Sequence, residues 1–225
     1  MGKLSIVATP IGNLEDITLR ALRVLKEADL ILCEDTRVTK KLLTHYSITT
    51  STLSYHAHSG ETKVEKIAEL LRAGKNLALV VDAGTPGISD PGGELVTAVR
   101  LKLPEIIVEA VPGPSALVAA LSVCGIKATR FTFYGFLPHK KGRETLFRRI
   151  SSAEEASVFY ESTHRIEKTL ASLKEKVPER RVSLCKEITK VFEEVMIGTP
   201  AEILSRLALD HKKKKGEFVV IVEEK

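Results

Sequence analysis

Cysteine is scarce in this chain of 225 residues, and its scarcity limits the classes of protein to which the chain can belong. The three cysteines, Cys33, Cys124 and Cys185, are odd in number, widely spaced and set in apolar runs. This pattern favours buried free thiols in a reducing compartment over disulfide bridges or metal ligands. It excludes a small secreted domain held together by disulfides, and it predicts a cytoplasmic protein.

Long apolar runs are also lacking. No uncharged stretch reaches the roughly 18 residues that a membrane span needs, so we expect no membrane protein. The apolar stretch Leu4–Ala8 is far too short for the hydrophobic region of a signal peptide, and we interpret it as a first strand rather than as a targeting segment. The sequence has no internal repeat, and 44% of its residues are hydrophobic. This composition is typical of a globular protein with one or two cores.

The charge of the chain is unevenly distributed. Residues 1–112 hold 13 basic and 14 acidic side chains, whereas residues 113–225 hold 21 and 15, which places the whole positive surplus in the second half. Clustered Lys and Arg side chains gain affinity by releasing counterions from phosphates, so this half is a candidate surface for a polyanion. An ordinary lysine-rich surface explains so small an excess equally well.

Short apolar runs alternate with segments of helical period, which predicts an α/β protein. A plausible helix cap at Asp16 precedes the stripe Leu19, Leu22, Leu25 and Ala28. In the first half we expect strands at Leu4–Ala8, Asp29–Cys33, Thr52–Tyr55, Leu77–Val81 and Ile106–Val111, with further helices at Lys63–Ala73 and Glu94–Leu101. Strands with intervening helices imply a mostly parallel sheet.

The turn-forming run Pro112-Gly113-Pro114-Ser115 predicts a domain boundary, with domains at residues 1–113 and 114–225. Beyond it we expect strands at Phe131–Phe136, Ser157–Tyr160, Val182–Ile188, Glu194–Gly198 and Glu217–Glu223, and helices at Ala116–Val123, Arg143–Ile150, Arg165–Leu173 and Ala201–Ala208. The segment from 182 to 198 has the pattern of a hairpin. The second sheet is therefore expected to be mixed.

A segment rich in glycine and proline, from Asp82 to Gly93, directly follows the expected strand at Leu77–Val81 and leads into a helix. Such a turn lets the backbone approach a ligand closely, and the helix N-terminus offers unpaired N–H groups. It is neither a Walker loop nor the Gly-x-Gly-x-x-Gly dinucleotide fingerprint. The alternative is a tight structural crossover.

Three other loops follow expected parallel strands, and such loops gather at one edge of a sheet. They are Thr9–Asn13, Glu34–Arg37 and Tyr55–His58. Taken alone, Glu34-Asp35-Thr36 is better interpreted as a helix N-cap. His56 and His58 stand two apart in an expected extended segment and therefore on one face, which suits proton transfer or metal binding. No set of residues with zinc spacing accompanies them, so we predict no metal site.

A basic cluster follows the aromatic strand Phe131–Phe136, and aromatic and cationic side chains together suit RNA. Aromatic residues that alternate along a strand are nevertheless more often half buried than available for stacking. The basic residues of the cluster are Lys140, Lys141, Arg143, Arg148 and Arg149.

Eight motifs occur in an order that resembles the tetrapyrrole-methylase superfamily. More closely they resemble its ribosomal RNA small subunit methyltransferase I branch, the 16S rRNA cytidine-1402 2′-O-methyltransferases. The motifs are residues 7–14 (VATPIGNL), 34–37 (EDTR), 82–92, 111–116 (VPGPSA), 135–138 (GFLP), 161–165 (ESTHR), 186–190 (KEITK) and 216–218 (GEF).

The resemblance implies a two-domain α/β fold of the class III methyltransferases, with S-adenosyl-L-methionine bound in the cleft between the domains. It also implies a homodimer, and 16S rRNA of the 30S ribosomal subunit as partner. Relatives often continue beyond the position of Lys225, so an extension that contacts RNA is expected to be lacking. The cofactor contacts of the family fall on Pro10, Asp82, Ala83, Gly84, Ile88, Ser115, Ala116 and Leu137.

Transfer of a methyl group to a ribose hydroxyl requires alignment and the removal of a proton. Four residues are candidates for that catalytic step: Asp35, His56, His58 and Glu161. Arg37 and Arg165 are candidate clamps for phosphate or substrate. Two alternatives stay open, a methylase of small tetrapyrroles that shares the fold, and a non-catalytic RNA-binding protein with a vestigial cofactor cleft.

Overall fold

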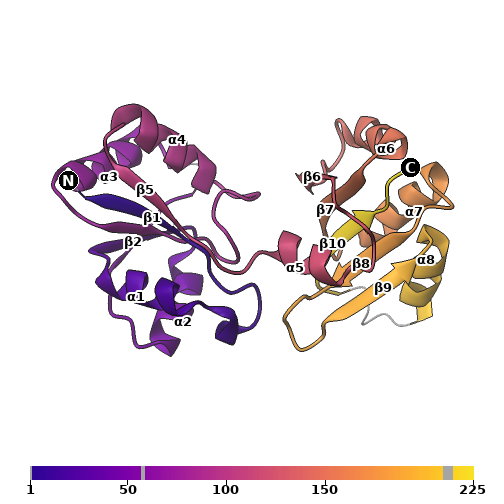
Figure 1. Cartoon of the computed structure of the whole chain (residues 1–225), viewed down its shortest axis with the longest axis horizontal. Coiled ribbons are helices and arrows are strands. Elements are labelled where there is room, and N and C mark those ends of the chain that lie inside the picture. The colour runs from indigo at the N-terminus through magenta and orange to yellow at the C-terminus, as the bar shows by residue number, and fades with distance from the viewer. Residues whose placement is uncertain (1, 57–58, 210–214) are drawn as a thin grey trace. The chain divides into compact units, whose positions relative to one another are not determined.

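The computed structural model describes residues 2–56, 59–209 and 215–225, and the chain divides into two compact units, residues 1–115 and 116–225 (Figure 1). The division falls two residues beyond the boundary expected from the turn-forming run. Each unit has its own five-stranded sheet.

The first unit is built on a parallel sheet. The strands β1 (Lys3–Val7), β2 (Leu30–Cys33), β3 (Thr52–Ser54), β4 (Leu77–Leu79) and β5 (Ile107–Val111) lie in the order β3-β2-β4-β1-β5. Each neighbouring pair is parallel, which confirms the predicted sheet. All the carboxyl ends of these strands therefore meet at one edge, where the loops of interest lie.

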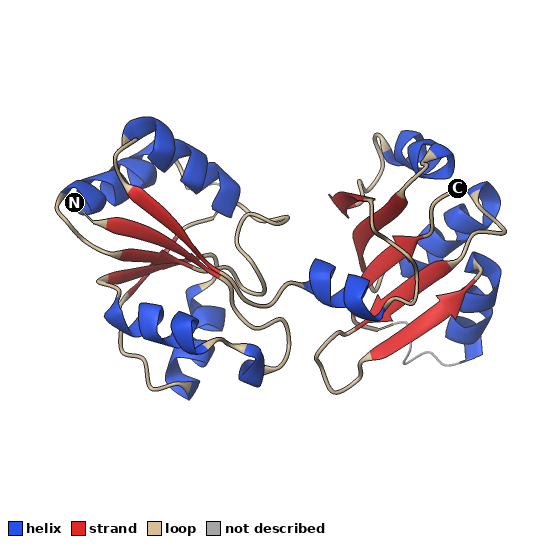
Figure 2. Cartoon of the chain, viewed as in Figure 1, coloured by secondary structure: helices blue, strands red, loops and turns tan. Residues whose placement is uncertain are grey.

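Helices cover both faces of this sheet (Figure 2). The helices α1 (Leu19–Glu27) and α2 (Thr36–His45) pack on one face, and α3 (Glu61–Arg72) and α4 (Gly92–Lys102) on the other. The expected cap at Asp16 is wrong, because a 3-10 turn, Leu14–Asp16, precedes the helix. Thr18 caps α1 instead, and its hydroxyl accepts the Ala21 N–H at 3.0 Å. Helix α2 was not among the predicted helices.

The second unit holds a mixed sheet, as predicted. Its strands are β6 (Phe131–Phe136), β7 (Ala156–Ser162), β8 (Val182–Lys186), β9 (Glu194–Gly198) and β10 (Glu217–Val222), in the order β6-β7-β10-β8-β9. Only β6 and β7 are parallel, and β8 and β9 form the expected antiparallel hairpin. Strand β6 is thus an edge strand.

Three helices of the second unit pack their apolar sides on one face of its sheet: α6 (Arg143–Ser152), α7 (Ile166–Lys176) and α8 (Pro200–Leu209). Helix α5 (Ala116–Val123) lies against the other face (Figure 2), where the Cys185 thiol is 3.9 Å from the Ala120 carbonyl oxygen. All three cysteines are buried and free, which confirms the prediction. None of the described helices is long and apolar enough to cross a membrane.

Candidate active site

The loops at the carboxyl edge of the first sheet are fastened to one another. Thr9, after β1, and Gly84, after β4, exchange backbone hydrogen bonds of 3.0 and 3.1 Å. The Thr9 hydroxyl also donates to the Val81 carbonyl at 3.1 Å. The Thr85 hydroxyl donates to the Pro114 carbonyl at 3.0 Å, which ties the same loop to the segment after β5. Three loops from distant parts of the sequence therefore form one connected rim.

The conformation of the glycine-rich turn depends on glycines with positive φ angles and on hydrogen bonds within the turn. Gly84 and Gly87 have φ angles of +86° and +91°, a backbone conformation that residues with a Cβ rarely adopt. The Asp90 carboxylate accepts the backbone N–H groups of Gly87, Ile88 and Gly92 at 2.8, 3.0 and 2.7 Å. A Cβ on Gly92 would lie 2.9 Å from the Gly87 nitrogen. The turn therefore needs these glycines for its geometry, whether or not a ligand approaches it.

Asp35 proves to be the N-cap of α2. Its carboxylate accepts the Arg37 N–H at 2.8 Å and pairs with the Arg37 guanidinium at 2.6 Å. These contacts lower the pKa of Asp35 to about 2. A carboxylate with so low a pKa is a weak base, and this argues against our assignment of Asp35 to proton removal. The Asp35 N–H donates to the Asp82 carboxylate at 3.2 Å, which links the β2 and β4 loops.

Glu34 is the residue that the sequence reasoning missed. It is the first residue after β2 and is partly buried at the carboxyl edge. Burial, followed by the negative charges of Asp82 and Asp90, raises the pKa of Glu34, and the neighbouring His56 partly offsets this rise in pKa. A carboxylate with a raised pKa is the better proton acceptor near neutral pH. The signal in the sequence was its place directly after a parallel strand.

The expected pair of histidines can be judged only in part, because His58 lies outside the described residues. His56 is exposed, and its N–H donates to the Ser59 hydroxyl at 2.9 Å. Its carbonyl accepts the Ser59 N–H at 2.7 Å. The chain thus turns at His56, and the expected extended segment ends one residue after β3. Within the described part of the chain, no group of three or more His, Cys, Asp or Glu residues is placed to hold a metal ion.

Glu161, another predicted base, lies in a buried charge cluster of the second unit. Its side chain has no exposed surface, and its carboxylate is 2.7 Å from the Arg165 guanidinium and 3.6 Å from that of Arg143. The Thr169 hydroxyl donates to it at 2.6 Å. These contacts argue against two of the predicted roles, because the buried Glu161 carboxylate is already engaged and the guanidinium of Arg143, which is 8% exposed, pairs with it.

The same cluster fastens the loop that follows β6. Arg165 donates to the Leu137 carbonyl at 2.7 Å, and Arg143 donates to the Pro138 carbonyl at 3.2 Å. The Leu137 side chain is buried in the core of the second unit. Arg165 therefore acts here as a structural anchor, with 15% of its side chain exposed.

The remaining predicted residues lie as follows. In the first unit, Pro10, Ala83, Ile88 and Ser115 are partly or fully exposed on the loops of the rim, and Arg37 has 87% of its side chain exposed. In the second unit, Ala116 begins α5, and Lys140, Lys141, Arg148 and Arg149 are exposed before and along α6.

Comparison with known proteins identifies the family. The family model of Tetrapyrrole (Corrin/Porphyrin) Methylases matches residues 3–204. Ribosomal RNA small subunit methyltransferase I of Xylella fastidiosa is 46% identical over 224 residues, which are 99% of this chain and 81% of that protein. The protein of the same name from Thermotoga maritima is 44% identical over 225 residues, 100% of each chain.

A solved structure shares the fold. Uroporphyrin-III C-methyl transferase from Thermus thermophilus, complexed with S-adenyl homocysteine, superposes with a TM-score of 0.65 at 20% identity, over 99% of this chain and 98% of that chain. From the family match and the two relatives together, the chain is a methyltransferase that belongs to the tetrapyrrole (corrin/porphyrin) methylase family, in the branch whose members are named ribosomal RNA small subunit methyltransferase I.

Proposed function

We propose that this methyltransferase transfers a methyl group from S-adenosyl-L-methionine to the ribose 2′-oxygen of cytidine 1402 in 16S rRNA. The observation that carries the proposal is the identity of 46% and 44%, over almost the whole chain, to two relatives named for ribosomal RNA of the small subunit. The nucleotide and the ribose oxygen are those that the resemblance of the eight motifs implies.

The rim of the first sheet suits S-adenosyl-L-methionine on electrostatic grounds. Burial, followed by the negative charges of Asp82 and Asp90, raises the pKa of Glu34, and these two carboxylates give the edge a negative potential. A methyl donor with a sulfonium and an ammonium group is favoured by such a potential. We assign its binding to Pro10, to residues 82–84 and to Ile88 in the first unit, with Ser115. When bound, it supplies a methyl group that a nucleophile can attack.

The chain must position the ribose hydroxyl and take its proton. We assign proton removal to Glu34, because it combines a place at the rim with a raised pKa. His56, which interacts electrostatically with Glu34, remains the second candidate. Arg37 is exposed beside this edge, and we assign it to a phosphate of the substrate. Holding the reactants in line supplies much of the reduction of the barrier.

The two alternatives are less favoured. The relatives with 44–46% identity are named for ribosomal RNA, whereas the uroporphyrin methylase at 20% identity shares only the fold with this chain. The non-catalytic alternative is less favoured because both relatives are named as methyltransferases.

The test is a transfer assay with a radiolabelled methyl donor and three acceptors: naked 16S rRNA, assembled small ribosomal subunits and uroporphyrinogen. We expect label in RNA, and faster transfer to the particle, because the chain offers a modest basic surface and must gain specificity from RNA shape. Label in uroporphyrinogen alone would establish the tetrapyrrole alternative. Donor binding without transfer to any acceptor would establish the non-catalytic one.

Two further parts of the proposal concern the setting of the enzyme. We expect the enzyme in the cytoplasm, where a ribosomal substrate is found. We also expect a homodimer, as the resemblance implies, and the apolar side chains of Val191 and Phe192, 93% and 73% exposed after β8, suit a surface that a second copy covers. Sedimentation equilibrium tests this, and a monomer at micromolar concentration would contradict it.

A further inference from the structure

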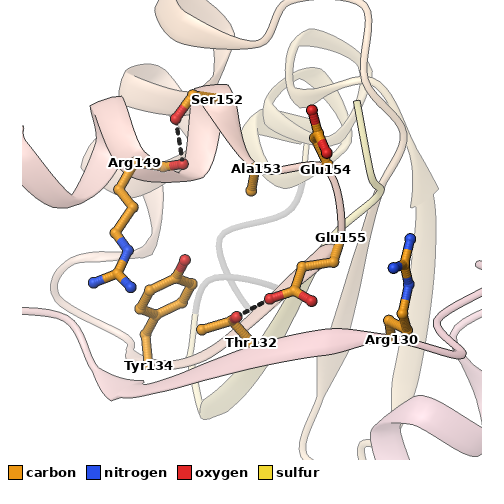
Figure 3. Close-up of a pocket in the computed structure, with 8 residues that line it drawn as sticks. All are labelled: Arg130, Thr132, Tyr134, Arg149, Ser152, Ala153, Glu154 and Glu155. Atoms are coloured by element: carbon orange, nitrogen blue, oxygen red, sulfur yellow. Dashed lines mark hydrogen bonds between the residues drawn. The ribbon is translucent and has the colours of Figure 1, made fainter.

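The second unit contains a groove between its edge strand and the end of α6. Arg130, Thr132 and Tyr134 alternate along β6 and its approach and therefore share one side of the strand (Figure 3). Arg149 and Ser152 come from α6, and residues 153–155 close the groove on the way to β7. Its volume is about 380 Å³. This lies within the roughly 300–1,000 Å³ of small-ligand sites.

The two arginines of the groove are available to a ligand. Arg149 and Tyr134 point toward each other, with the guanidinium carbon 5.9 Å from the centre of the ring (Figure 3). Arg130 lies toward the other end of the groove (Figure 3). Both arginines are exposed, and neither forms an ion pair with a carboxylate of the described residues. Glu155 is held by a hydrogen bond from the Thr132 hydroxyl.

We propose that this groove binds a nucleotide of single-stranded small-subunit ribosomal RNA. The phosphates on either side of it contact Arg130 and Arg149, and its base stacks on the pair formed by Arg149 and Tyr134. Guanidinium planes and aromatic rings are the usual stacking partners of unpaired bases in RNA-binding proteins. The proposal rests on the proposed function, and it names the surface by which the second unit holds the RNA.

The mixture of charges in the groove favours a nucleotide over an acidic peptide. Glu154 and Glu155 line the same groove as the two arginines. Their carboxylates would repel the side chains of an acidic peptide, whereas they can accept hydrogen bonds from base amino groups and ribose hydroxyls. A nucleotide brings both an anionic phosphate and such donors, and it therefore matches both kinds of side chain.

The experiment measures binding of a fluorescent single-stranded oligoribonucleotide, with the sequence around cytidine 1402, by fluorescence anisotropy at several salt concentrations. Replacing Arg130→Ala and Arg149→Ala together should weaken binding and reduce the slope of log K against log salt by about 0.7 for each charge. Tyr134→Leu should weaken binding by about 5-fold or more, because stacking contributes roughly 1–3 kcal/mol per base. Tyr134→Phe, which retains the ring, should bind as the wild type does.

A matched control is Arg206→Ala. Arg206 is exposed on α8, which packs beside β9 at the opposite edge of the same sheet from β6. This variant should keep the affinity of the wild type, although it loses one positive charge, as each of the two groove replacements does. Thermal unfolding of every variant separates a loss of contacts from a loss of fold.

The outcomes separate the groove from the proposed function. If the wild type methylates small-subunit rRNA and the groove variants, still folded, bind the oligoribonucleotide as tightly as the wild type, the groove assignment is wrong and the proposed function stands. Displacement of the RNA by an acidic peptide and not by a mononucleotide would also overturn the groove assignment. If the wild type neither binds nor methylates rRNA, both proposals fail.

Discussion

Thr9 and Gly84, which are 75 residues apart by their numbers, are joined by two backbone hydrogen bonds of 3.0 and 3.1 Å. The pair connects the loop after β1 to the glycine-rich turn after β4. Because Gly84 has a φ of +86°, this bridge depends on a conformation that only glycine adopts without strain. The candidate cofactor site is thus held by backbone contacts that a single Cβ can disturb.

Gly84→Ala should weaken the binding of S-adenosyl-L-methionine. A Cβ at this position would meet Ile11 at 3.4 Å, which is ordinary contact, so the cost comes from the backbone, about 1–3 kcal/mol. Gly74→Ala is the matched control, because Gly74 has a similar φ of +84° and no atom lies within 4 Å of a Cβ placed there. Gly74 precedes β4 and therefore lies at the amino ends of the strands, away from the rim. Calorimetric titration should show weakened donor binding only for Gly84→Ala. Equal donor affinity in the two variants would show that the turn does not bind the donor.

Glu34→Gln should slow methyl transfer and yet stabilise the protein at neutral pH. The folded pKa of Glu34 lies above its ordinary value of 4.5, so its favourable contribution to stability is present below pH 4.5 and is lost as the pH rises through the folded pKa. The amide removes that penalty, and the gain in unfolding free energy should vanish below pH 4.5. The Glu34→Gln substitution should also remove the rise of kcat with pH that a general base produces. If the variant has the kcat of the wild type, His56 becomes the candidate for the general base.

Asp35→Ala should reveal a contribution to stability whose dependence on pH is opposite to that of Glu34. The hydrogen bonds and charge of Arg37 lower the pKa of Asp35 from 3.8 to about 2. The stability that the ionised carboxylate contributes is therefore fully present above pH 3.8 and is lost as the pH falls through about 2. Above pH 4 we therefore expect this variant to be less stable than the wild type by a constant amount. Chemical denaturation across the range measures this. A change in stability that continues to grow above pH 5 would contradict the helix-cap role.

Glu161→Gln should destabilise the second unit strongly. Removing one charge from a buried ion pair typically costs about 3–5 kcal/mol, and here it leaves the guanidinium groups of Arg143 and Arg165 without their anion. Glu179→Gln, at an exposed position after α7, should change the unfolding free energy by less than about 0.5 kcal/mol. If Glu161→Gln unfolds like the wild type and loses only activity, Glu161 is a catalytic residue after all.

The fold was largely predictable because its signals are local. The spacing of hydrophobic residues located the strands and most helices to within a few residues, and the α5 and β6 boundaries agree with the expected ones. The Asp16 cap failed because two cap-forming residues, Asp16 and Thr18, stand close together, and only the start of the helix decides between them. Helix α2 was missed although its N-cap, Asp35, was considered.

The site was less predictable because its properties depend on residues that are distant in the sequence. Charge type suggested that Arg143 and Glu161 act at a surface, since unpaired charged side chains are almost never buried. Their burial follows from a pairing across 18 positions that periodicity does not reveal. In the same way, the raised pKa of Glu34 depends first on its burial and then on Asp82 and Asp90, which come close to it only when the parallel strands assemble.

The central claim is that the chain methylates the 2′-oxygen of cytidine 1402, and alkaline hydrolysis tests it most directly. A free 2′-hydroxyl attacks the neighbouring phosphodiester in alkali, so a methyl group on that oxygen leaves a gap in the hydrolysis ladder. The measurement compares 16S rRNA from cells with and without the gene, and from cells that carry the Glu34→Gln variant. We predict a full gap at cytidine 1402 where the wild-type gene is present, a weakened gap where the Glu34→Gln variant replaces it, and no gap where the gene is absent. An uninterrupted ladder at that cytidine in wild-type cells would contradict the account.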